Sequence, residues 1–220
     1  MLWGASMAAG AEALRRTKNM SKATGLAIKA TQIISDSFQR LAKATDCKEI
    51  TKCNWSKKCS IAKYMVSGKI FGYFNLASKW VPQAIEAAHE GLKANLDNLP
   101  EKCISFAPEI VRKMEGTDEE VVMVAGFAGG LGLKDGGCGA LVAAIWKTIL
   151  ELVRKRNWKY TLNDPVTMES LNRFLKVSDY KIECYDITGK KFSSAIEHSD
   201  FIINGGCDNL INTISQTAHI

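Results

Sequence analysis

The 220-residue chain lacks most features that mark secreted, fibrous or disordered proteins. It has only four prolines, and its residues are 24% charged and 46% hydrophobic. No segment reaches the roughly 18 uncharged apolar residues that a membrane-spanning helix needs. The apolar start, Met1 to Ala13, has its basic residues after it, which is the wrong order for a signal peptide. These absences predict a globular, cytoplasmic protein without a transmembrane segment.

Short cysteine motifs are also absent. None of the seven cysteines forms Cys-x-x-Cys, and without Cys-x-x-Cys-His a c-type haem is not expected. An odd number of cysteines at long spacings argues against a disulfide framework and favours metal binding or redox chemistry. No Ser/His/Asp set or carboxylate pair stands out, so the sequence gives no support for a hydrolase.

Positive charge is in modest excess, with a formal net charge of +6. The tightest basic cluster, Arg154-Lys155-Arg156, follows a long apolar run. Cations at the end of a helix complement its dipole, so we interpret the cluster structurally and predict no nucleic-acid partner. The excess charge would also steer an acidic redox partner, which the sequence does not identify.

Hydrophobic periodicity predicts a mainly α fold, because apolar residues recur at three- and four-residue spacing along most of the chain. Val121 to Ala125 has strand character, yet Thr117 to Glu120 is typical of a helix N-cap. The nearby glycines do not match the dinucleotide-binding fingerprint, so nucleotide binding is not expected. The expected helices cover residues 4–16, 22–41, 71–92, 102–114, 138–156, 164–175 and 207–216.

The glycine-rich stretch from Gly126 to Ala144 is the most informative segment, because it carries Cys138 from a loop to the start of an apolar helix. Unpaired N–H groups at a helix start stabilise a thiolate and lower its pKa. A thiolate is the form that binds metal or attacks disulfides. The alternative is that Cys138 is a small apolar side chain in a tight junction.

The chain also repeats itself. Residues 46–51 and 183–188 share the pattern acid, Cys, any, acid, Ile, Thr at an offset of 137, and two further matches lie at offsets of 135 and 134. We therefore predict an internally duplicated helical bundle with a glycine-rich loop before its central helix. Residues 1–95 form a degenerate scaffold repeat, in which Trp3 and Tyr73 replace Cys138 and Cys207, and residues 96–220 form the four-cysteine repeat. The two repeats would pack about a pseudo-twofold axis, as two chains of a homodimer would, and homodimerisation stays open.

The C-terminal repeat resembles the C_GCAxxG_C_C family of redox-active proteins. Cys103, the block from Gly129 through Cys138 to Ala140, and the last two cysteines match the family pattern, whereas Ala143 stands where its central motif ends in glycine. The resemblance implies that Cys103 opens a helix. It extends to split-Soret cytochromes, whose similar cysteine domain is associated with an iron–sulfur centre. The implied site residues are Cys103, Cys138, Cys184 and Cys207.

Four converging thiolates have three uses that the sequence leaves open. The first is an iron–sulfur cluster for electron transfer or redox sensing, since four cysteines are its standard ligand set. The second is cofactor-free thiol–disulfide chemistry with Cys138 as the attacking thiol. The third is a structural zinc site in an interaction module.

Two other groups of residues could suggest a functional site, but we expect both to have only a structural role. Cys47, Cys53 and Cys59 are six residues apart, a spacing that does not keep side chains on one helical face. His198 follows Glu197 near a helix start, where we expect a solvated side chain, with a role beside the cysteines as the alternative.

Overall fold

The computed structural model describes residues 1–95, 99, 102–155, 161 and 164–216. Apart from two isolated β-bridges, Gly130 with Asp135 and Gly137 with Glu183, the regular structure of these residues is helical. The prediction of a mainly α fold is confirmed. None of the described helices combines the length and the hydropathy that crossing a bilayer requires.

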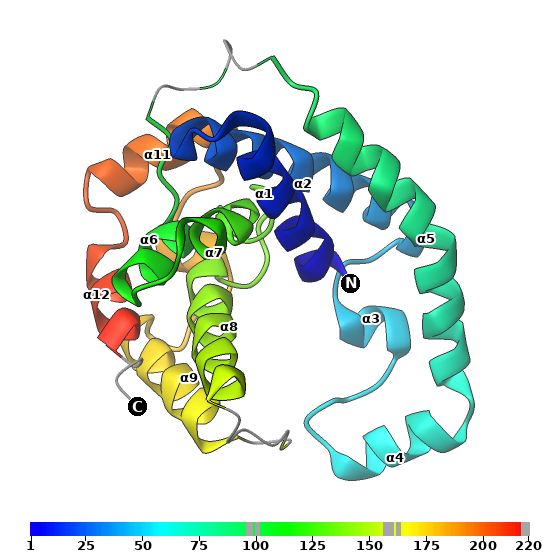
Figure 1. Ribbon diagram of the computed structural model, residues 1–220. Coiled ribbons are helices and arrows are strands. Elements are labelled where there is room, and N and C mark those ends of the chain that lie inside the picture. The colour runs from blue at the N-terminus through cyan, green and yellow to red at the C-terminus, as the bar shows by residue number, and fades with distance from the viewer. Residues whose placement is uncertain (96–98, 100–101, 156–160, 162–163, 217–220) are drawn as a thin grey trace.

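The helices follow one another in two series (Figure 1). The first series is α1 (Leu2–Thr17), α2 (Met20–Ala42), α3 (Cys47–Thr51), α4 (Lys58–Val66) and α5 (Lys69–Gly91). The second is α6 (Phe106–Lys113), α7 (Asp118–Met123), the 3₁₀ turn η2 (Ala125–Phe127), α8 (Gly139–Arg154), α9 (Pro165–Val177), α10 (Cys184–Thr188), α11 (Ala195–Ile203) and α12 (Asp208–Ser215). All seven expected helices are present, whereas the short α3, α4 and α10 were not expected because five to nine residues give little periodicity.

Side-chain caps explain where several helices begin. Asn19 caps α2 and Asp164 caps α9, which has Pro165 in its first turn, where a missing N–H costs nothing. Thr117 and Glu120 form a reciprocal capping box at α7. The helix reading of this segment is therefore right, and the strand reading of Val121 to Ala125 is wrong.

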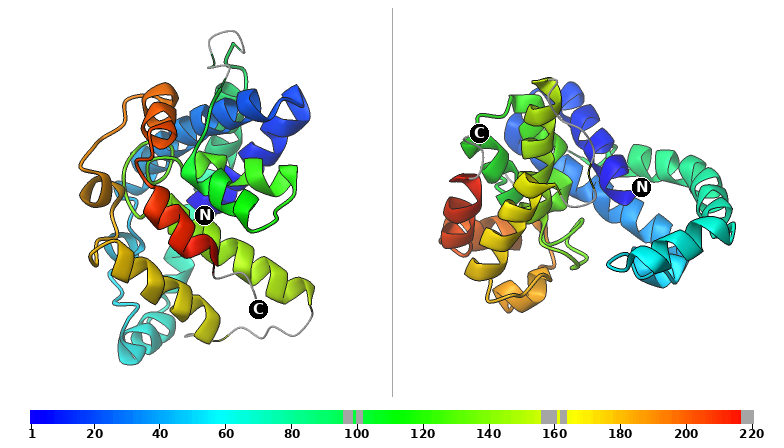
Figure 2. Two further views of the ribbon diagram at one scale, coloured as in Figure 1. Left: turned by 90° about the vertical axis from the view of Figure 1, so that its left-hand side faces the viewer. Right: turned by 90° about the horizontal axis from the view of Figure 1, so that it is seen from below.

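At the centre of the molecule, α6, α7 and η2 lie between the first series and the helices α8 to α12 (Figures 1 and 2). Helices α1 and α2 pack on α7 and η2 from one side, and α8 packs on α6 from the other. A first apolar cluster joins α1, α2 and α5 to this centre, and a second joins α6, α8, α9, α11 and α12. Since the first cluster also includes Ala107, Val122 and Ala143, residues 1–95 share their core with the C-terminal part. The predicted boundary itself adjoins residues 96–98, which lie outside the described part.

The first series, α1 to α5, resembles the last five helices of the second, α8 to α12. Helices α3 and α10, and likewise α4 and α11, have the same bounds at an offset of 137 residues, and α1 and α8 begin at the same offset. Thr51 donates its hydroxyl hydrogen bond to the Cys47 carbonyl at 2.6 Å, and Thr188 donates to the Cys184 carbonyl at 2.8 Å. This likeness supports the duplication, which stays a prediction. At the offset of 137 the residue that matches Cys138 is Met1, also an N-cap residue, whereas the sequence match at an offset of 135 pairs Cys138 with Trp3.

One expected helix begins late. Residues 102–105 have no regular structure, and α6 begins only at Phe106, so Cys103 does not open a helix. Two serine hydroxyls hold this segment: Ser21 accepts from the Cys103 N–H at 2.5 Å and Ser199 accepts from the Ile104 N–H at 3.0 Å. These hydrogen bonds replace the helical ones that the periodicity of residues 102–114 predicted.

We predict opposite effects for two glycine-to-alanine changes in α1. At Gly10, a Cβ would overlap the Val122 carbonyl oxygen and lie 2.8 Å from the Met123 Cα, because α1 and α7 touch backbone to backbone there. Gly10→Ala should lower the free energy of unfolding by about 1–3 kcal/mol. At Gly4 a Cβ meets nothing within 4 Å, so Gly4→Ala should raise it by about 0.5–1 kcal/mol. Urea denaturation measures both, and equal effects at the two positions would contradict this packing.

Candidate functional site

The site is built around the loop that ends at Cys138. Cys138 is the N-cap residue of α8, as the sequence predicted. Its N–H donates to the Ile182 carbonyl at 2.9 Å, and the Cys184 N–H donates to the Gly136 carbonyl at 2.9 Å. These two hydrogen bonds flank the β-bridge of Gly137 with Glu183. Since side chains alternate along extended backbone, Cys138 and Cys184 lie on the same face of the bridge.

Three of the four predicted site cysteines meet in one place. Cys138, Cys184 and Cys207 belong to the second apolar cluster, where they pack among side chains of α6, α8, α9, α11 and α12. Cys138 and Cys184 are buried, and Cys207 is half-buried. Burial raises the pKa of both other thiols, and a thiolate at Cys138 would raise them further, so the three lie within electrostatic reach of one another.

Cys103 lies apart from these three. It is buried in a small third cluster with Ile28 and Ala128, and burial alone raises its pKa to about 12. Leu133, at the end of the glycine-rich turn, packs against both this cluster and the one that holds the other cysteines. The structure therefore brings together three of the predicted ligands and leaves the fourth beyond this turn.

The expected thiolate at Cys138 is not what the surroundings favour. Burial raises the pKa of this thiol above its ordinary value, although hydrogen bonds from the Leu141 and Ala140 N–H groups act in the opposite direction. Burial together with neighbouring charges raises the pKa of Cys184 and of Cys207 to about 12. The prediction of a lowered pKa at Cys138 is wrong because loss of hydration outweighs the helix N-terminus.

A small opening reaches the cluster beside Cys184. A cavity of about 130 Å³ is lined by Cys184, the Gly129 and Leu133 turn, and the side chains of Lys134, Lys190 and Lys191. Lys134 also forms an ion pair with Asp36 of α2 at 2.9 Å. Asp135 lines the same cavity, and its charge is one of the causes, after burial, that raise the pKa of Cys184. Burial, followed by the charges of Asp135 and Asp186, raises the pKa of Glu183.

The present side-chain positions do not form a ready metal site. Within residues 1–95, 99, 102–155, 161 and 164–216, no three His, Cys, Asp or Glu side chains are arranged to hold a metal ion. The three clustered thiols have suitable ligand chemistry, and two backbone N–H groups already point at one of them. Binding would thus require the thiols to move closer and lose their protons.

The N-terminal cysteines occupy three different surroundings. Cys47 begins α3 and Cys59 lies in α4, and both are exposed. Cys53 is buried between these helices, with its sulfur 3.6 Å from the Ser60 hydroxyl. Trp3 is half-buried with its ring edge-on to Phe127 at 4.6 Å, and Tyr73 is also half-buried.

His198 is buried, so the expectation of a solvated side chain is wrong. Its ring lies edge-on to Phe106 and Phe192, with centroid distances of 4.3 and 4.9 Å. Neither ring nitrogen has a partner at hydrogen-bond geometry. Burial lowers its pKa to about 4, against a small opposite effect of the Ile104 backbone. The neutral ring joins the α11 side of the cysteine cluster to the segment that carries Cys103.

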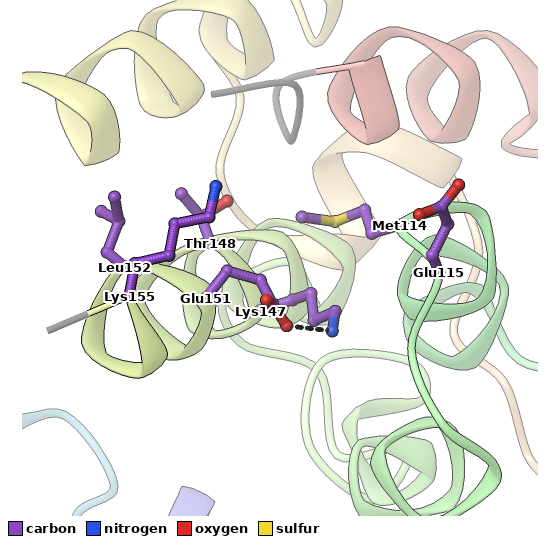
Figure 3. Close-up of a pocket in the computed structure, with 7 residues that line it drawn as sticks. All are labelled: Met114, Glu115, Lys147, Thr148, Glu151, Leu152 and Lys155. Atoms are coloured by element: carbon purple, nitrogen blue, oxygen red, sulfur yellow. Dashed lines mark hydrogen bonds and ion pairs between the residues drawn. The ribbon is translucent and has the colours of Figure 1, made fainter.

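The basic end of α8 holds a buried ion-pair network that the sequence did not reveal. The Lys147 ammonium pairs with Glu120 at 2.9 Å and with Glu151 at 2.6 Å, and Arg154 pairs with Glu120 at 2.6 Å. Figure 3 shows the adjoining cavity of about 220 Å³, lined by Met114, Glu115, Lys147, Thr148, Glu151, Leu152 and Lys155. Since Lys147 and Glu120 neutralise each other, the network ties α7 to α8. Arg154 thus takes part in ion pairs within the protein, and Arg156 lies outside the described residues.

Comparison of the chain with protein-family models, with curated proteins and with solved structures gave no match. The resemblance to the C_GCAxxG_C_C family therefore depends on its cysteine and glycine motifs alone and stays a prediction.

We predict that alkylation separates the cysteines by location. Cys47 and Cys59 are exposed, whereas Cys184 is buried with a pKa of about 12, which lowers its thiolate fraction roughly 1000-fold from that of an ordinary thiol. Iodoacetamide at neutral pH should modify Cys47 and Cys59 first and leave Cys103, Cys138 and Cys184 to react only on unfolding. Peptide mass spectrometry measures the order. Rapid labelling of Cys138 in the folded protein would contradict the buried cluster.

We also predict an acid-sensitive fold that depends on His198. The unfolded histidine takes up a proton near pH 6.5, whereas the folded one does so only near pH 4. The free energy of unfolding should therefore fall as the pH drops between these values, by about 3 kcal/mol in total. His198→Leu should remove this part of the pH dependence in urea titrations, while a change at the exposed His89, His89→Gln, should leave it intact. An unchanged slope in His198→Leu would show that other groups cause it.

Proposed function

We propose that the C-terminal half holds a thiolate-ligated redox centre, with an iron–sulfur cluster as the bound group. The observation that carries the proposal is the meeting of Cys138, Cys184 and Cys207, far apart in sequence, in one buried apolar cluster. Metals and clusters are bound by thiolates in such poorly hydrated surroundings. When bound, a cluster of this kind supplies one-electron transfer.

The protein's own residues fit this role in two ways. The Ala140 and Leu141 N–H groups, which already act on the Cys138 sulfur, would stabilise its negative charge in the ligated form. Lys134, Lys190 and Lys191 line the cavity beside Cys184 and would offset the charge of several thiolates. Because the pKa values of Cys184 and Cys207 are raised to about 12, ligation releases protons, and affinity should increase with pH.

Cys103 is the candidate fourth ligand. Its segment, residues 102–105, has no regular structure and is attached through the hydroxyls of Ser21 and Ser199. Bringing its thiol past Leu133 to the other three would break these hydrogen bonds but no helix. Whether Cys103 is a ligand can therefore be tested separately from the three clustered cysteines.

The alternatives are less well supported. An attacking thiol in disulfide exchange needs thiolate character and access, and Cys138 is buried with a raised pKa. A structural zinc site would use the same residues without changing oxidation state. A reductant distinguishes an iron–sulfur cluster from zinc, because zinc does not change its oxidation state.

The test is metal and sulfide analysis of the full chain purified without oxygen, with single Cys→Ser variants. We expect iron, acid-labile sulfide and a visible absorption that dithionite bleaches. Cys138→Ser, Cys184→Ser and Cys207→Ser should each lose most of the iron, while the exposed control Cys59→Ser should keep it. Retention in Cys103→Ser would define a centre with three protein ligands.

Two results would overturn the proposal. One is a chain that stays free of metal and colour after anaerobic reconstitution with iron and sulfide. The other is stoichiometric zinc that survives both dithionite and oxidant, which would establish the structural role instead. Circular dichroism of each variant shows whether a loss of iron reflects ligation or a failure to fold.

A further inference from the structure

The arm formed by residues 50–85, which include α4 and most of α5, differs from the rest of the molecule in charge. Between Glu49 and Glu86 there are six lysines and no acidic residue, so this segment alone carries a formal charge of +6. That value equals the net charge of the whole chain, and the remaining residues balance. All six side chains are exposed: Lys52, Lys57, Lys58, Lys63, Lys69 and Lys79.

The same arm exposes large apolar side chains. Val66, at the end of α4, is 89% exposed, and Phe71 and Phe74, at the start of α5, are 74% and 60% exposed. Trp55 and Met65 add to this group, and Trp55 is held edge-on against Tyr64 with a centroid distance of 5.5 Å. Exposed apolar groups gathered in this way mark a surface that contacts another apolar phase or molecule.

On α5 these side chains form a regular stripe. At 3.6 residues per turn, Phe71, Phe74, Val81 and Ile85 lie within about 80° of one another and extend over about 21 Å. Trp80 and Ala84 lie on the opposite face, which packs on α2. Helix α5 is thus apolar on two faces, of which only one is covered within the described part of the chain.

The arm projects from the body of the protein. Figures 1 and 2 show α4 and the first turns of α5 at the end of the molecule remote from α12. Helix α4 packs against α5 and against no other helix to a similar extent. Helix α4 and the start of α5 can therefore be approached from the side that faces away from α12.

We propose that this arm binds the surface of membranes that contain anionic lipid. The six lysines would contact lipid phosphate and carboxylate groups, and the apolar stripe of α5 with Val66 would enter the boundary of the acyl region. The charge argues against a second copy of this chain on the same surface, because two segments of +6 would repel. The aliphatic members of the surface, Val66, Val81 and Ile85, favour acyl chains over nucleic acid, whose bases stack on aromatic rings.

The test is flotation of the full chain with phosphatidylcholine vesicles, prepared with and without phosphatidylserine. We expect binding only when phosphatidylserine is present, together with a blue shift of tryptophan fluorescence and a loss of binding at high salt. Lys57→Gln/Lys58→Gln should weaken binding about 10- to 30-fold. Phe71→Ser/Phe74→Ser should weaken it at least as strongly, since both rings are mostly exposed in the free protein.

Matched controls change the same residue types elsewhere. Lys176→Gln/Lys181→Gln removes two exposed lysines, and Ile196→Ser/Ile203→Ser removes two exposed apolar side chains, all in the C-terminal half. Both controls should bind like the unchanged protein. Since no cysteine is altered, the outcome is independent of the proposed redox centre.

Three results would overturn the proposal. The first is no flotation with anionic vesicles, and the second is equal flotation with both kinds of vesicle. The third is binding that the control variants weaken as much as the arm variants do. Dimerisation that Phe71→Ser/Phe74→Ser abolishes, without flotation, would assign the stripe to self-association. Oligonucleotide binding that needs the lysines but not the two phenylalanines would show that the lysines bind nucleic acid instead of lipid.

Discussion

The close contact of the turn η2 with helices on both sides is the constraint on which the rest of the structure depends. A Cβ at Gly126 would collide with the side chains of Ser6 and Thr31, which hydrogen-bond to each other at 2.8 Å between α1 and α2. A Cβ at Gly139, the first residue of α8, would collide with the carbonyl oxygen of Phe127. The turn thus fixes both the N-terminal helix pair and the start of α8. Because Cys138 directly precedes Gly139, the same contact also fixes the position of Cys138.

From that fixed point the cysteine cluster follows by backbone pairing. The loop after η2 returns to Gly136, where the bridge to residues 182–184 sets the position of α10. Helix α12 then packs on α6, α8 and α9 and brings Cys207 to the same core. The thiols are gathered by hydrophobic packing, and this packing also raises their pKa values. Burial therefore brings the thiols together and at the same time disfavours their thiolate forms.

Part of this arrangement was readable from sequence, and the reasons for the misses are physical. Long amphipathic helices such as α2 and α5 were predicted because periodicity accumulates over many residues. Capping chemistry likewise predicted α7 from Thr117 and Glu120. The repeated pattern at Cys47 and Cys184 pointed to two alike segments but not to the short helices that they form. Burial was not readable: nothing local distinguishes His198 or Lys147 from a solvated side chain, since their surroundings come from distant segments.

Helices α1 to α5 and α8 to α12 follow one another in a similar order but pack differently. In the C-terminal series, α11 and α12 fold back onto the core and enclose the cysteines. In the N-terminal series, residues 71–78 of α5 lie where α12 lies at the 137-residue offset, and they leave Phe71 and Phe74 mostly exposed. An arm without acidic residues repels other cations and is poorly screened by its own chain. The same place in the order of helices is therefore enclosed in the C-terminal half and presents a charged, apolar surface in the N-terminal half.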